Sequence, residues 1–274
     1  MGLTFNAILD GYGIDARQVR LLRHQNGAVK GRTLYSLWRD DHPSFIAYQN
    51  IQSSQNRSRL TSPYWAAFIV TPAQSNMFVG LYEIERIGEC PEGTIDPFRL
   101  HDATGLDLYR STLVGISEPD IGRIFIDWGP GTRTWAQKAA DQPKPILEIT
   151  RTFREEEFPG YTRFIANLST IGALPSSWLA TLGAAKGIYL LTCPRTKEQY
   201  VGSAYGEHGL LGRWLTYVRD GHGGNVVLKS RDKSDYQVSI LEVCGSAASM
   251  EEIIATEGLW KAKLQTREMG LNGN

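Results

Sequence analysis

A short stretch near the carboxyl end, Gly187–Ala204 (GIYLLTCPRTKEQYVGSA), limits the fold more than any other part of the chain. Two apolar runs rich in β-branched and aromatic residues, Gly187–Cys193 and Gln199–Ser203, flank a polar turn that contains a proline and charged residues. That pattern predicts a β-hairpin. Each arm carries one tyrosine, Tyr189 or Tyr200, and cross-strand partners in a hairpin lie close together. We therefore expect the two tyrosines on neighbouring strands.

The residues after the hairpin predict a helix, a third strand and a second helix. Glu207–Asp220 has apolar residues at helical spacing, and Arg213 and Tyr217, four residues apart, share one side of this helix. Its apolar stripe consists of Leu210, Leu211, Trp214, Leu215 and Val218. Tyr236–Val243 alternates as a strand does, and Ser249–Thr266 has the apolar side of a helix. The predicted order is strand, strand, helix, strand, helix.

Two half-motifs on the predicted hairpin, Gly187-Ile188-Tyr189 and Tyr200-Val201-Gly202, carry a family resemblance. The chain from about Ala184 to Asn274 resembles the GIY-YIG endonuclease superfamily, in particular restriction-type members with an N-terminal DNA-recognition domain. Val201 stands where the family usually has isoleucine. The resemblance implies a small mixed sheet flanked by helices and a nuclease that acts on double-stranded DNA.

Further residues match the family in the same order along the chain. Arg213 corresponds to the helical arginine, Glu257 to the acidic metal ligand and Asn272 to the late asparagine. Tyr217 stands where homing members have a histidine, as in restriction-type members. Five separated features in the family's order are far more specific than the two half-motifs alone. The catalytic residues implied by the resemblance are Tyr189, Tyr200, Arg213, Tyr217 and Glu257, with Glu257 as the metal ligand.

The chemistry of phosphodiester hydrolysis gives each of these groups a role. A Mg²⁺ or Mn²⁺ ion on Glu257 would polarise the phosphate and stabilise the leaving oxygen, and Mg²⁺ keeps several waters, so one carboxylate suffices. Arg213 offers a charged, forked donor to the phosphate. We assign Tyr189 as general base, with its pKa of ~10 lowered by Arg213 and the metal. Tyr200 and Tyr217 position water or phosphate, and the three roles are exchangeable.

Several assignments have a competing structural interpretation. Glu251 and Glu252 are close enough to Glu257 to rival it as the metal ligand. His222, in a glycine-rich loop, is either a phosphate contact or an idle loop residue, and Asn272 is either a DNA contact or a turn residue near the terminus. The candidate contacts to phosphate or DNA are His222, Asn272, Lys197 and Arg133.

Composition describes an ordinary globular protein that is long enough for two domains: 274 residues, 42% hydrophobic and 21% charged. No apolar run approaches the ~20 residues of a membrane helix. The three cysteines, Cys90, Cys193 and Cys244, have no paired spacing. We therefore expect a cytoplasmic protein without a membrane segment, a zinc site or a disulfide framework.

The net charge of zero is not what a nucleic-acid-binding protein shows by default. Residues 1–60 hold eight Lys/Arg against four Asp/Glu, whereas residues 61–130 hold four against ten and residues 184–274 hold eleven against ten. A basic DNA-binding surface must therefore come from local placement of side chains. Outside the nuclease-like part, the first sixty residues are its leading source.

The amino-terminal part of the chain predicts a β-rich domain, either a curved sheet or a small barrel, over residues 1–170. Residues 171–183 are expected to form a connector and residues 184–274 the nuclease domain. One or two helical turns in Phe5–Arg23 precede the strands, which are expected at Thr33–Trp38, Phe45–Gln49, Ala66–Val70, Phe78–Ile84, Leu113–Ile116, Ile124–Asp127 and Ile146–Ile149. The expected fold class is α+β: a C-terminal GIY-YIG α/β nuclease domain preceded by a β-rich, barrel-like domain.

Two features of the amino-terminal part are candidates for DNA recognition. Aromatic side chains interleaved with arginine stack on bases or enclose an extruded one. The candidate stacking residues are Trp38, Arg39, Phe45, Tyr48, Tyr64 and Trp65. The glycines of Ile126–Trp135 would bring backbone close to a phosphate, with Arg133 in contact with it. The alternative is that the tryptophans of this part fill the core of a β domain.

The hypothesis that accounts for most of these features is a divalent-metal-dependent DNA endonuclease of restriction or genome-defence type. Its N-terminal domain would read a sequence or a modified base, because a small nuclease domain lacks the surface for a long specific site. Two alternatives are an inactive DNA-binding protein and a repair nuclease that reads distorted DNA. The expected partner is double-stranded DNA, with modified bases as one class of target, and the protein is expected to be a monomer or a homodimer.

Overall fold

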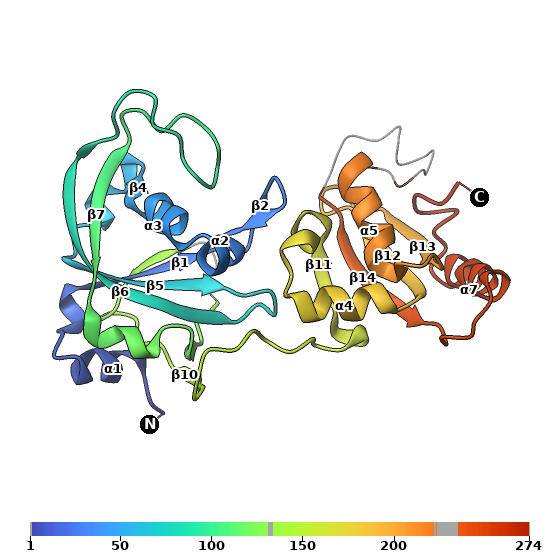
Figure 1. The fold of residues 1–274 in the computed structure, drawn as a ribbon, viewed down its shortest axis with the longest axis horizontal. Coiled ribbons are helices and arrows are strands. Elements are labelled where there is room, and N and C mark those ends of the chain that lie inside the picture. Colours follow the sequence, from blue (N-terminus) through green and yellow to red (C-terminus); the bar gives the residue numbers. More distant parts are fainter. Residues whose placement is uncertain (1, 131–133, 222, 224–234, 274) are drawn as a thin grey trace. The chain divides into compact units, whose positions relative to one another are not determined.

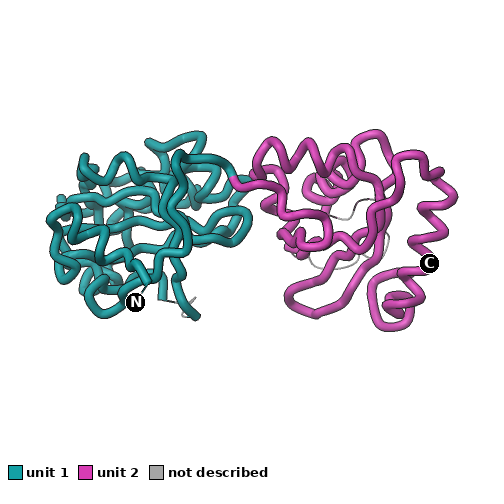
Figure 2. The backbone as a smooth tube through the Cα atoms, turned by 90° about the horizontal axis from the view of Figure 1, so that it is seen from below, with its two compact units in different colours: residues 1–155 teal, residues 156–274 magenta. Residues whose placement is uncertain are grey.

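The computed structural model of this chain describes residues 2–130, 134–221, 223 and 235–273. The chain divides into two compact units, Met1–Glu155 (unit 1) and Glu156–Asn274 (unit 2), which Figure 2 shows in separate colours. Unit 2 therefore begins before the expected domain boundary at residue 170. Residues 171–183, expected as a connector, lie in two helices whose side chains Ile171, Trp178 and Leu182 belong to the core of unit 2.

Unit 1 is built on an eight-stranded sheet. Six of its strands follow the order β10-β8-β6-β5-β1-β9, β7 pairs with β6, and β4 pairs with β7. Strands β1 and β5 are parallel, and the other pairs are antiparallel. The strands are β1 (Val19–His24), β4 (Ile51–Gln52), β5 (Tyr64–Val70), β6 (Asn76–Glu89), β7 (Asp107–Leu113), β8 (Ile124–Ile126), β9 (Ala136–Lys138) and β10 (Ile146–Ile149). A separate hairpin pairs β2 (Ala28–Val29) with β3 (Arg32–Thr33).

The sheet of unit 1 curls into a half-barrel because its long strand β6 changes partner along its length (Figure 1). The first half of β6 pairs with β5 and the second half with β7. Register irregularities between Ala67 and Phe68 and between Arg86 and Gly88 bend the strands at these changes. The prediction of a curved, β-rich domain is confirmed, and the sheet stays open.

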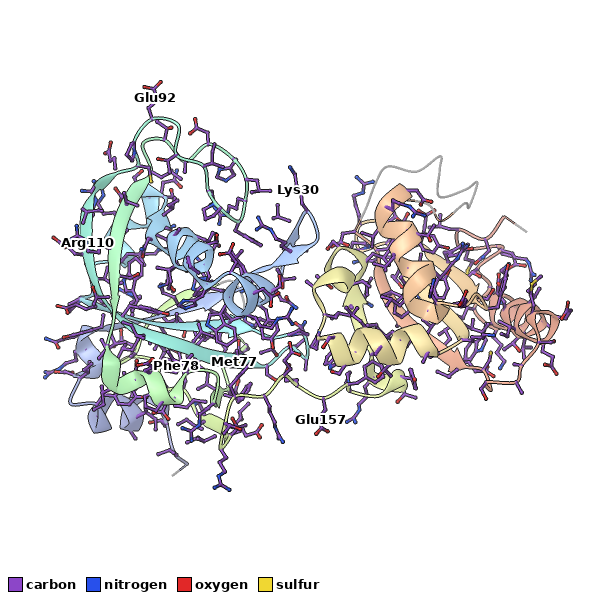
Figure 3. The ribbon with its side chains drawn as sticks, in the orientation of Figure 1. Lys30, Met77, Phe78, Glu92, Arg110 and Glu157 are labelled. Atoms are coloured by element: carbon purple, nitrogen blue, oxygen red, sulfur yellow. The ribbon has the colours of Figure 1, made fainter. Side chains whose placement is uncertain are left out.

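Helices cover both faces of this curled sheet. The helices and short 3₁₀ turns of unit 1 are α1 (Phe5–Gly11), η1 (Ala16–Gln18), α2 (Leu34–Asp40), α3 (His42–Asn50), η2 (Ser54–Arg59) and η3 (Gly115–Asp120). Phe5 of α1 packs with Phe78 on one face, and Phe45 of α3 packs with Met77 on the other. Met77 and Phe78, labelled in Figure 3, are neighbours on β6 and serve opposite faces.

Two of the expected strands of unit 1 are helices instead. Thr33–Trp38 lies mostly in α2, which begins with a capping box: the Thr33 hydroxyl accepts from the Ser36 N–H, and the Ser36 hydroxyl accepts from the Thr33 N–H. Phe45–Gln49 lies in α3, whose first turn is capped by Asp41 and contains a proline. Capping residues outweighed the strand propensity of the aromatic residues here. Leu113–Ile116 is also not a strand, because β7 ends at Leu113.

Unit 2 holds a four-stranded sheet with the order β11-β14-β12-β13, and all three described pairings are antiparallel. The expected mixed sheet was wrong in this respect. The elements are η4 (Tyr161–Arg163), β11 (Ile165–Asn167), η5 (Leu168–Ala173), α4 (Ser176–Ala184), β12 (Gly187–Thr192), β13 (Gln199–Ala204), α5 (Gly209–Asp220), β14 (Gln237–Val243) and α7 (Met250–Lys263). The hairpin, both helices and the third strand occur in the predicted order.

Helices lie against both faces of the unit 2 sheet (Figure 1). Trp214 of α5 stacks on Phe164 with the ring centroids 5.6 Å apart, so residues before the hairpin complete this core. Ile253 of α7 packs on the other face with Ile188 and Val201. The buried side of α5 is Leu210, Trp214 and Tyr217. The predicted stripe was wrong at Leu215 and Val218, which are 41% and 43% exposed.

Both motif glycines of the hairpin are explained by close contacts. Tyr189 of β12 pairs directly with Gly202 of β13, and the Tyr189 ring lies over this glycine. A Cβ atom at position 202 would come within 2.6 Å of the Tyr189 Cζ atom. A Cβ atom at Gly187 would press on the backbone of β14 at Glu242. The half-motifs therefore keep β12 tightly packed between its two neighbours.

No helix within the described ranges combines the length and the apolar character that crossing a membrane requires.

A buried carboxylate ties the β6–β7 half of unit 1 to η2. The Asp107 side chain has no exposed surface and forms ion pairs with Arg57 at 2.6 Å and Arg86 at 2.7 Å. Hydrogen bonds from Arg57, which has the larger effect, and from Arg86 lower the pKa of Asp107 to about 2, although burial alone would raise it. The pairing therefore stabilises the fold fully above the ordinary carboxyl pKa of ~3.9 and loses its effect as the pH falls toward 2.

We predict that Asp107→Asn lowers the unfolding free energy at neutral pH by about 3 kcal/mol, because it leaves Arg57 and Arg86 without their counter-charge. The difference from the wild-type protein should shrink between about pH 4 and pH 2. Urea unfolding across this pH range measures both effects. Glu85→Gln is the control, since Glu85 forms an exposed surface pair with Arg110 (labelled in Figure 3). A constant difference down to pH 2 would contradict the assignment.

Candidate active site

A cavity of about 650 Å³ lies in unit 2 where β13, α5 and α7 meet. Strand β13 is at the edge of the sheet, and α5 and α7 pack on opposite faces, so side chains of both helices reach past the edge strand. Tyr200 and Ser203 line the cavity from β13, Arg213 lines it from α5, and Glu257 and Lys261 line it from α7. Three of the five predicted catalytic residues therefore share one cavity.

The other two predicted catalytic residues are buried directly behind Arg213. The Tyr189 and Tyr217 hydroxyl oxygens are 3.0 Å apart and share a hydrogen bond. Arg213 Nε donates to the Tyr189 hydroxyl at 3.2 Å, and Arg213 Nη2 donates to the Tyr217 hydroxyl at 3.4 Å. The guanidinium also lies 5.1 Å from the centre of the Tyr217 ring, within the range of a cation–π contact. Two tyrosines therefore hold Arg213 in one orientation.

Burial opposes the lowered pKa that we expected for Tyr189. Tyr189 has no exposed surface and does not line the cavity. Burial raises its pKa above the ordinary tyrosine value, and the opposing effect of Arg213 is smaller. Burial also raises the pKa of Tyr217. Tyr200 is the tyrosine of the three that lines the cavity, so it is the one placed to contact a water or a phosphate there.

Glu257 is held by two neighbours that the sequence analysis did not single out. Lys261, one helical turn further along α7, pairs with Glu257 Oε1 at 2.8 Å, and both side chains are largely buried, at 6% and 14% exposure. The Ser203 hydroxyl donates to Glu257 Oε2. Glu252, a rival for the ligand role, instead caps α7 by accepting from the Ser249 N–H at 2.8 Å. Glu251 lies exposed in the first turn of α7.

The donor set at Glu257 is compatible with a hydrated divalent cation. A carboxylate offers about four lone-pair positions, and its one ion pair and one hydroxyl contact leave some of them for a metal. The positively charged Lys261 ammonium is already paired with this carboxylate. Within the described residues, no group of three or more His, Cys, Asp and Glu side chains could hold a metal. A Mg²⁺ ion held by Glu257 would have to keep most of its waters.

The Asn272 side chain is hydrogen-bonded to the edge strand β13. Its side-chain Nδ2 donates to the Val201 carbonyl, and its Oδ1 accepts from the Val201 N–H, both at 2.9 Å. These two bonds satisfy the backbone N–H and C=O of Val201 on the side of β13 that faces away from β12 in the described sheet. Asn272 is 3% exposed, so the DNA-contact role proposed for it was wrong. Its role is structural, as the alternative interpretation had it, but it holds β13 rather than a turn.

Of the other candidate phosphate contacts, Lys197 is described and does not line this cavity. Lys197 lies in the turn of the β12–β13 hairpin with φ of 67°, and its Nζ donates to the Pro194 carbonyl at 2.6 Å. His222 and Arg133 lie outside the described residues. Among the lining residues that the motif comparison did not indicate are three with basic side chains: His208, Lys261 and Arg267. Of these, Lys261 had a sequence signal, because it is four residues after Glu257 on the same helix.

The six candidate stacking residues of unit 1 are mostly structural. Phe45 and Trp65 are fully buried in core clusters, so the stacking role proposed for them was wrong. Arg39 pairs with Asp40 and Glu155, and Trp38 packs edge-on against Phe153 with the ring centroids 5.4 Å apart. Tyr64 is partly buried against the α1 face of the sheet. Tyr48 alone among the six lines one of the cavities of the described chain.

Comparison with known proteins finds partial similarity in two solved structures. One is the catalytic domain of the homing endonuclease I-TevI, at 24% identity, covering 32% of this chain and 96% of the other, with a TM-score of 0.27. The second is a variant of the same intron endonuclease domain, at 23% identity, covering 33% of this chain and 94% of the other, with a TM-score of 0.28. No family model matches the chain. No curated protein matches it.

Proposed function

We propose that this protein is a divalent-metal-dependent DNA endonuclease that hydrolyses phosphodiester bonds, acts in restriction or genome defence, and selects its target through unit 1. The observation that supports this most is the grouping of Tyr200, Arg213 and Glu257 around one cavity, with Tyr189 and Tyr217 fixing the arginine from behind. A phosphate needs a fixed cationic donor, an acidic anchor for a metal and a group that orients water. The cavity supplies all three.

Arg213 is the phosphate-binding group in this proposal. Its Nε and one N–H of Nη2 donate to the tyrosine hydroxyls, so among the described residues both N–H groups of Nη1 and the second N–H of Nη2 remain for a phosphate. A guanidinium fixed in advance loses little conformational freedom when it binds a phosphate oxygen. Tyr189 and Tyr217 act as positioning residues, because they contact Arg213 and lie behind it.

Tyr200 orients the attacking water, and Glu257 holds the metal ion through its carboxylate, with Ser203 fixing the second oxygen. When bound at Glu257, Mg²⁺ or Mn²⁺ supplies positive charge to the phosphate and to the leaving oxygen. Ser203 and Lys261 keep the carboxylate in one orientation toward the cavity. One such site cuts one strand, so a double-strand break requires a homodimer or successive cuts by a monomer.

Cleavage of supercoiled plasmid with Mg²⁺ or Mn²⁺ tests the proposal. We expect nicked or linear products that EDTA abolishes and that Glu257→Ala does not form. Tyr200→Phe should lower the rate by about 10²-fold, the cost of losing a group that orients the attacking water. Tyr189→Phe should lower the rate by only about tenfold, through a less fixed Arg213. Tyr161→Phe is the control, because Tyr161 lies outside the cavity lining.

Two outcomes would contradict this proposal. DNA binding without cleavage of plasmids of varied sequence and modification would favour an inactive DNA-binding protein. A large loss of activity in Tyr189→Phe together with no loss in Tyr200→Phe would contradict the role of Tyr200 and return the general-base role to Tyr189. Plasmid with and without modified cytosines should be cut at different rates if unit 1 reads a modified base.

We also predict that Lys261 competes with the metal for Glu257. The ammonium pairs with the carboxylate at 2.8 Å, so a divalent cation must share or displace that charge. Hydrogen bonds between charged groups contribute about 1.5–3 kcal/mol, so Lys261→Met should bind Mn²⁺ about tenfold more tightly. Titration followed by electron paramagnetic resonance without DNA measures this directly. Lys263→Met, on the same helix but exposed, is the control, and weaker Mn²⁺ binding by Lys261→Met would contradict the prediction.

A further inference from the structure

Unit 1 contains a cavity of about 700 Å³ at the end of β1, which the proposed cleavage chemistry does not use. It is lined by the last residues of β1, the last turn of α3, and the Asp96–His101 part of the loop between β6 and β7. This volume is within the range of about 300–1,000 Å³ that ligand pockets span. All of its lining residues belong to unit 1, so the cavity is complete within that unit.

Aromatic rings form part of the cavity wall. Tyr48 and Phe98 pack edge to face with their ring centroids 5.3 Å apart. Tyr48 remains partly exposed, and the Arg99 guanidinium lies 5.7 Å from the centre of its ring. Asp96, which is buried, accepts from the N–H groups of Phe98 and Arg99 at 2.8 and 2.7 Å. These bonds fix the loop so that a ring and a cation are presented at the cavity.

The inner end of the cavity is polar and uncharged. His24 lines it and is 6% exposed, and burial lowers its pKa to about 4, so the imidazole is neutral at physiological pH. Its Nε2 lies 3.0 Å from Oε1 of the fully buried Gln49. Among the described residues, Gln49 Nε2 has no hydrogen-bond partner. A buried imidazole and amide offer donors and acceptors in fixed positions, which is what the edge of a heterocyclic base requires.

The rim of the cavity is cationic. Arg23 and Arg99 line it, and the acidic residue of the lining, Asp96, is already engaged by backbone N–H groups. Arg23 Nε donates to the Asn76 side chain at 2.7 Å, so one side of this guanidinium is anchored to β6. Two arginines beside an aromatic ring suit a planar group attached to a phosphate.

We propose that this cavity binds a nucleobase, with Tyr48 as the stacking ring and His24, held from behind by Gln49, near the hydrogen-bonding edge of the base. This inference rests on the proposed function, because a base reaches such a cavity from duplex DNA only when it is rotated out of the stack. A free nucleotide has the same ring and phosphate, so both sources share this chemistry. The cavity would then be the place where unit 1 reads the identity or modification of one base.

Two binding measurements on the full chain carrying Glu257→Ala, which is not expected to cut, test the inference. The first is saturation-transfer NMR with the four common deoxynucleoside monophosphates and with 5-methyl-dCMP. The second is the fluorescence of 2-aminopurine in the centre of short duplexes with randomised flanks, with and without 5-methylcytosine. We expect transfer to at least one nucleotide and a several-fold rise in fluorescence as the base leaves the stack.

Three variants locate the binding in the cavity. Tyr48→Leu and Arg99→Ala should each weaken binding about tenfold, as loss of a stacking or cationic partner predicts. Arg110→Ala, which removes an exposed arginine of β7 outside the cavity lining, should have no effect. Thermal unfolding of each variant shows that it is folded. Because Tyr48→Leu changes a partly buried ring, Arg99→Ala provides the test at an exposed position.

Each result has a defined meaning. No saturation transfer to any nucleotide, or equal transfer in Tyr48→Leu and Arg99→Ala, would overturn the inference. Nucleotide binding without any rise in duplex fluorescence would overturn the assignment to an extruded base. The proposed nuclease function is judged separately by plasmid cleavage with an intact Glu257. Base binding without cleavage contradicts only that function, and cleavage without base binding contradicts only this inference.

Discussion

The arrangement of Arg213 between two buried tyrosine hydroxyls is the constraint on which the rest of unit 2 depends. A guanidinium is permanently charged, so it remains partly buried only where oxygen acceptors meet its donors. Those acceptors come from β12 and from α5 itself, which fixes the position of the helix on the sheet. The Tyr189 ring needs the space that Gly202 leaves. The position of the arginine that we propose for phosphate binding therefore depends on the half-motif glycine.

The second constraint is charge balance at the edge of the same sheet. Glu257 projects from α7 toward the cavity, and Lys261 and Ser203 occupy its two oxygens. A carboxylate this little exposed is costly without partners, and Lys261 supplies a counter-charge from one helical turn away. In our account this lysine keeps the anchor oriented. The site is therefore built before any metal or DNA arrives, which lowers the reorganisation that cleavage requires.

The sequence predicted local structure well wherever one pattern acted alone. The hairpin, the helix that carries Arg213 and the placing of Tyr217 beside Arg213 were predictable from spacing. The grouping of Arg213 with the hairpin tyrosines was implied by the family resemblance. The strands expected at 33–38 and 45–49 were not, because capping by Thr33 and Asp41 outweighed aromatic strand propensity. The burial that raises the pKa of Tyr189 depends on Phe164 and the helices before the hairpin, which complete a core that no local pattern reveals. The bonds of Asn272 to Val201 join residues far apart in sequence and were likewise invisible.

The central claim is that water, oriented in the Tyr200–Arg213–Glu257 cavity, attacks a DNA phosphate. Cleavage of a duplex in ¹⁸O-labelled water under single-turnover conditions, followed by mass spectrometry of the fragments, tests it most directly. The account predicts one ¹⁸O atom on each new 5′-phosphate, a free 3′-hydroxyl, and no DNA attached to the protein. Unlabelled phosphate with DNA joined to a tyrosine would show that a tyrosine is itself the nucleophile, and would contradict the account.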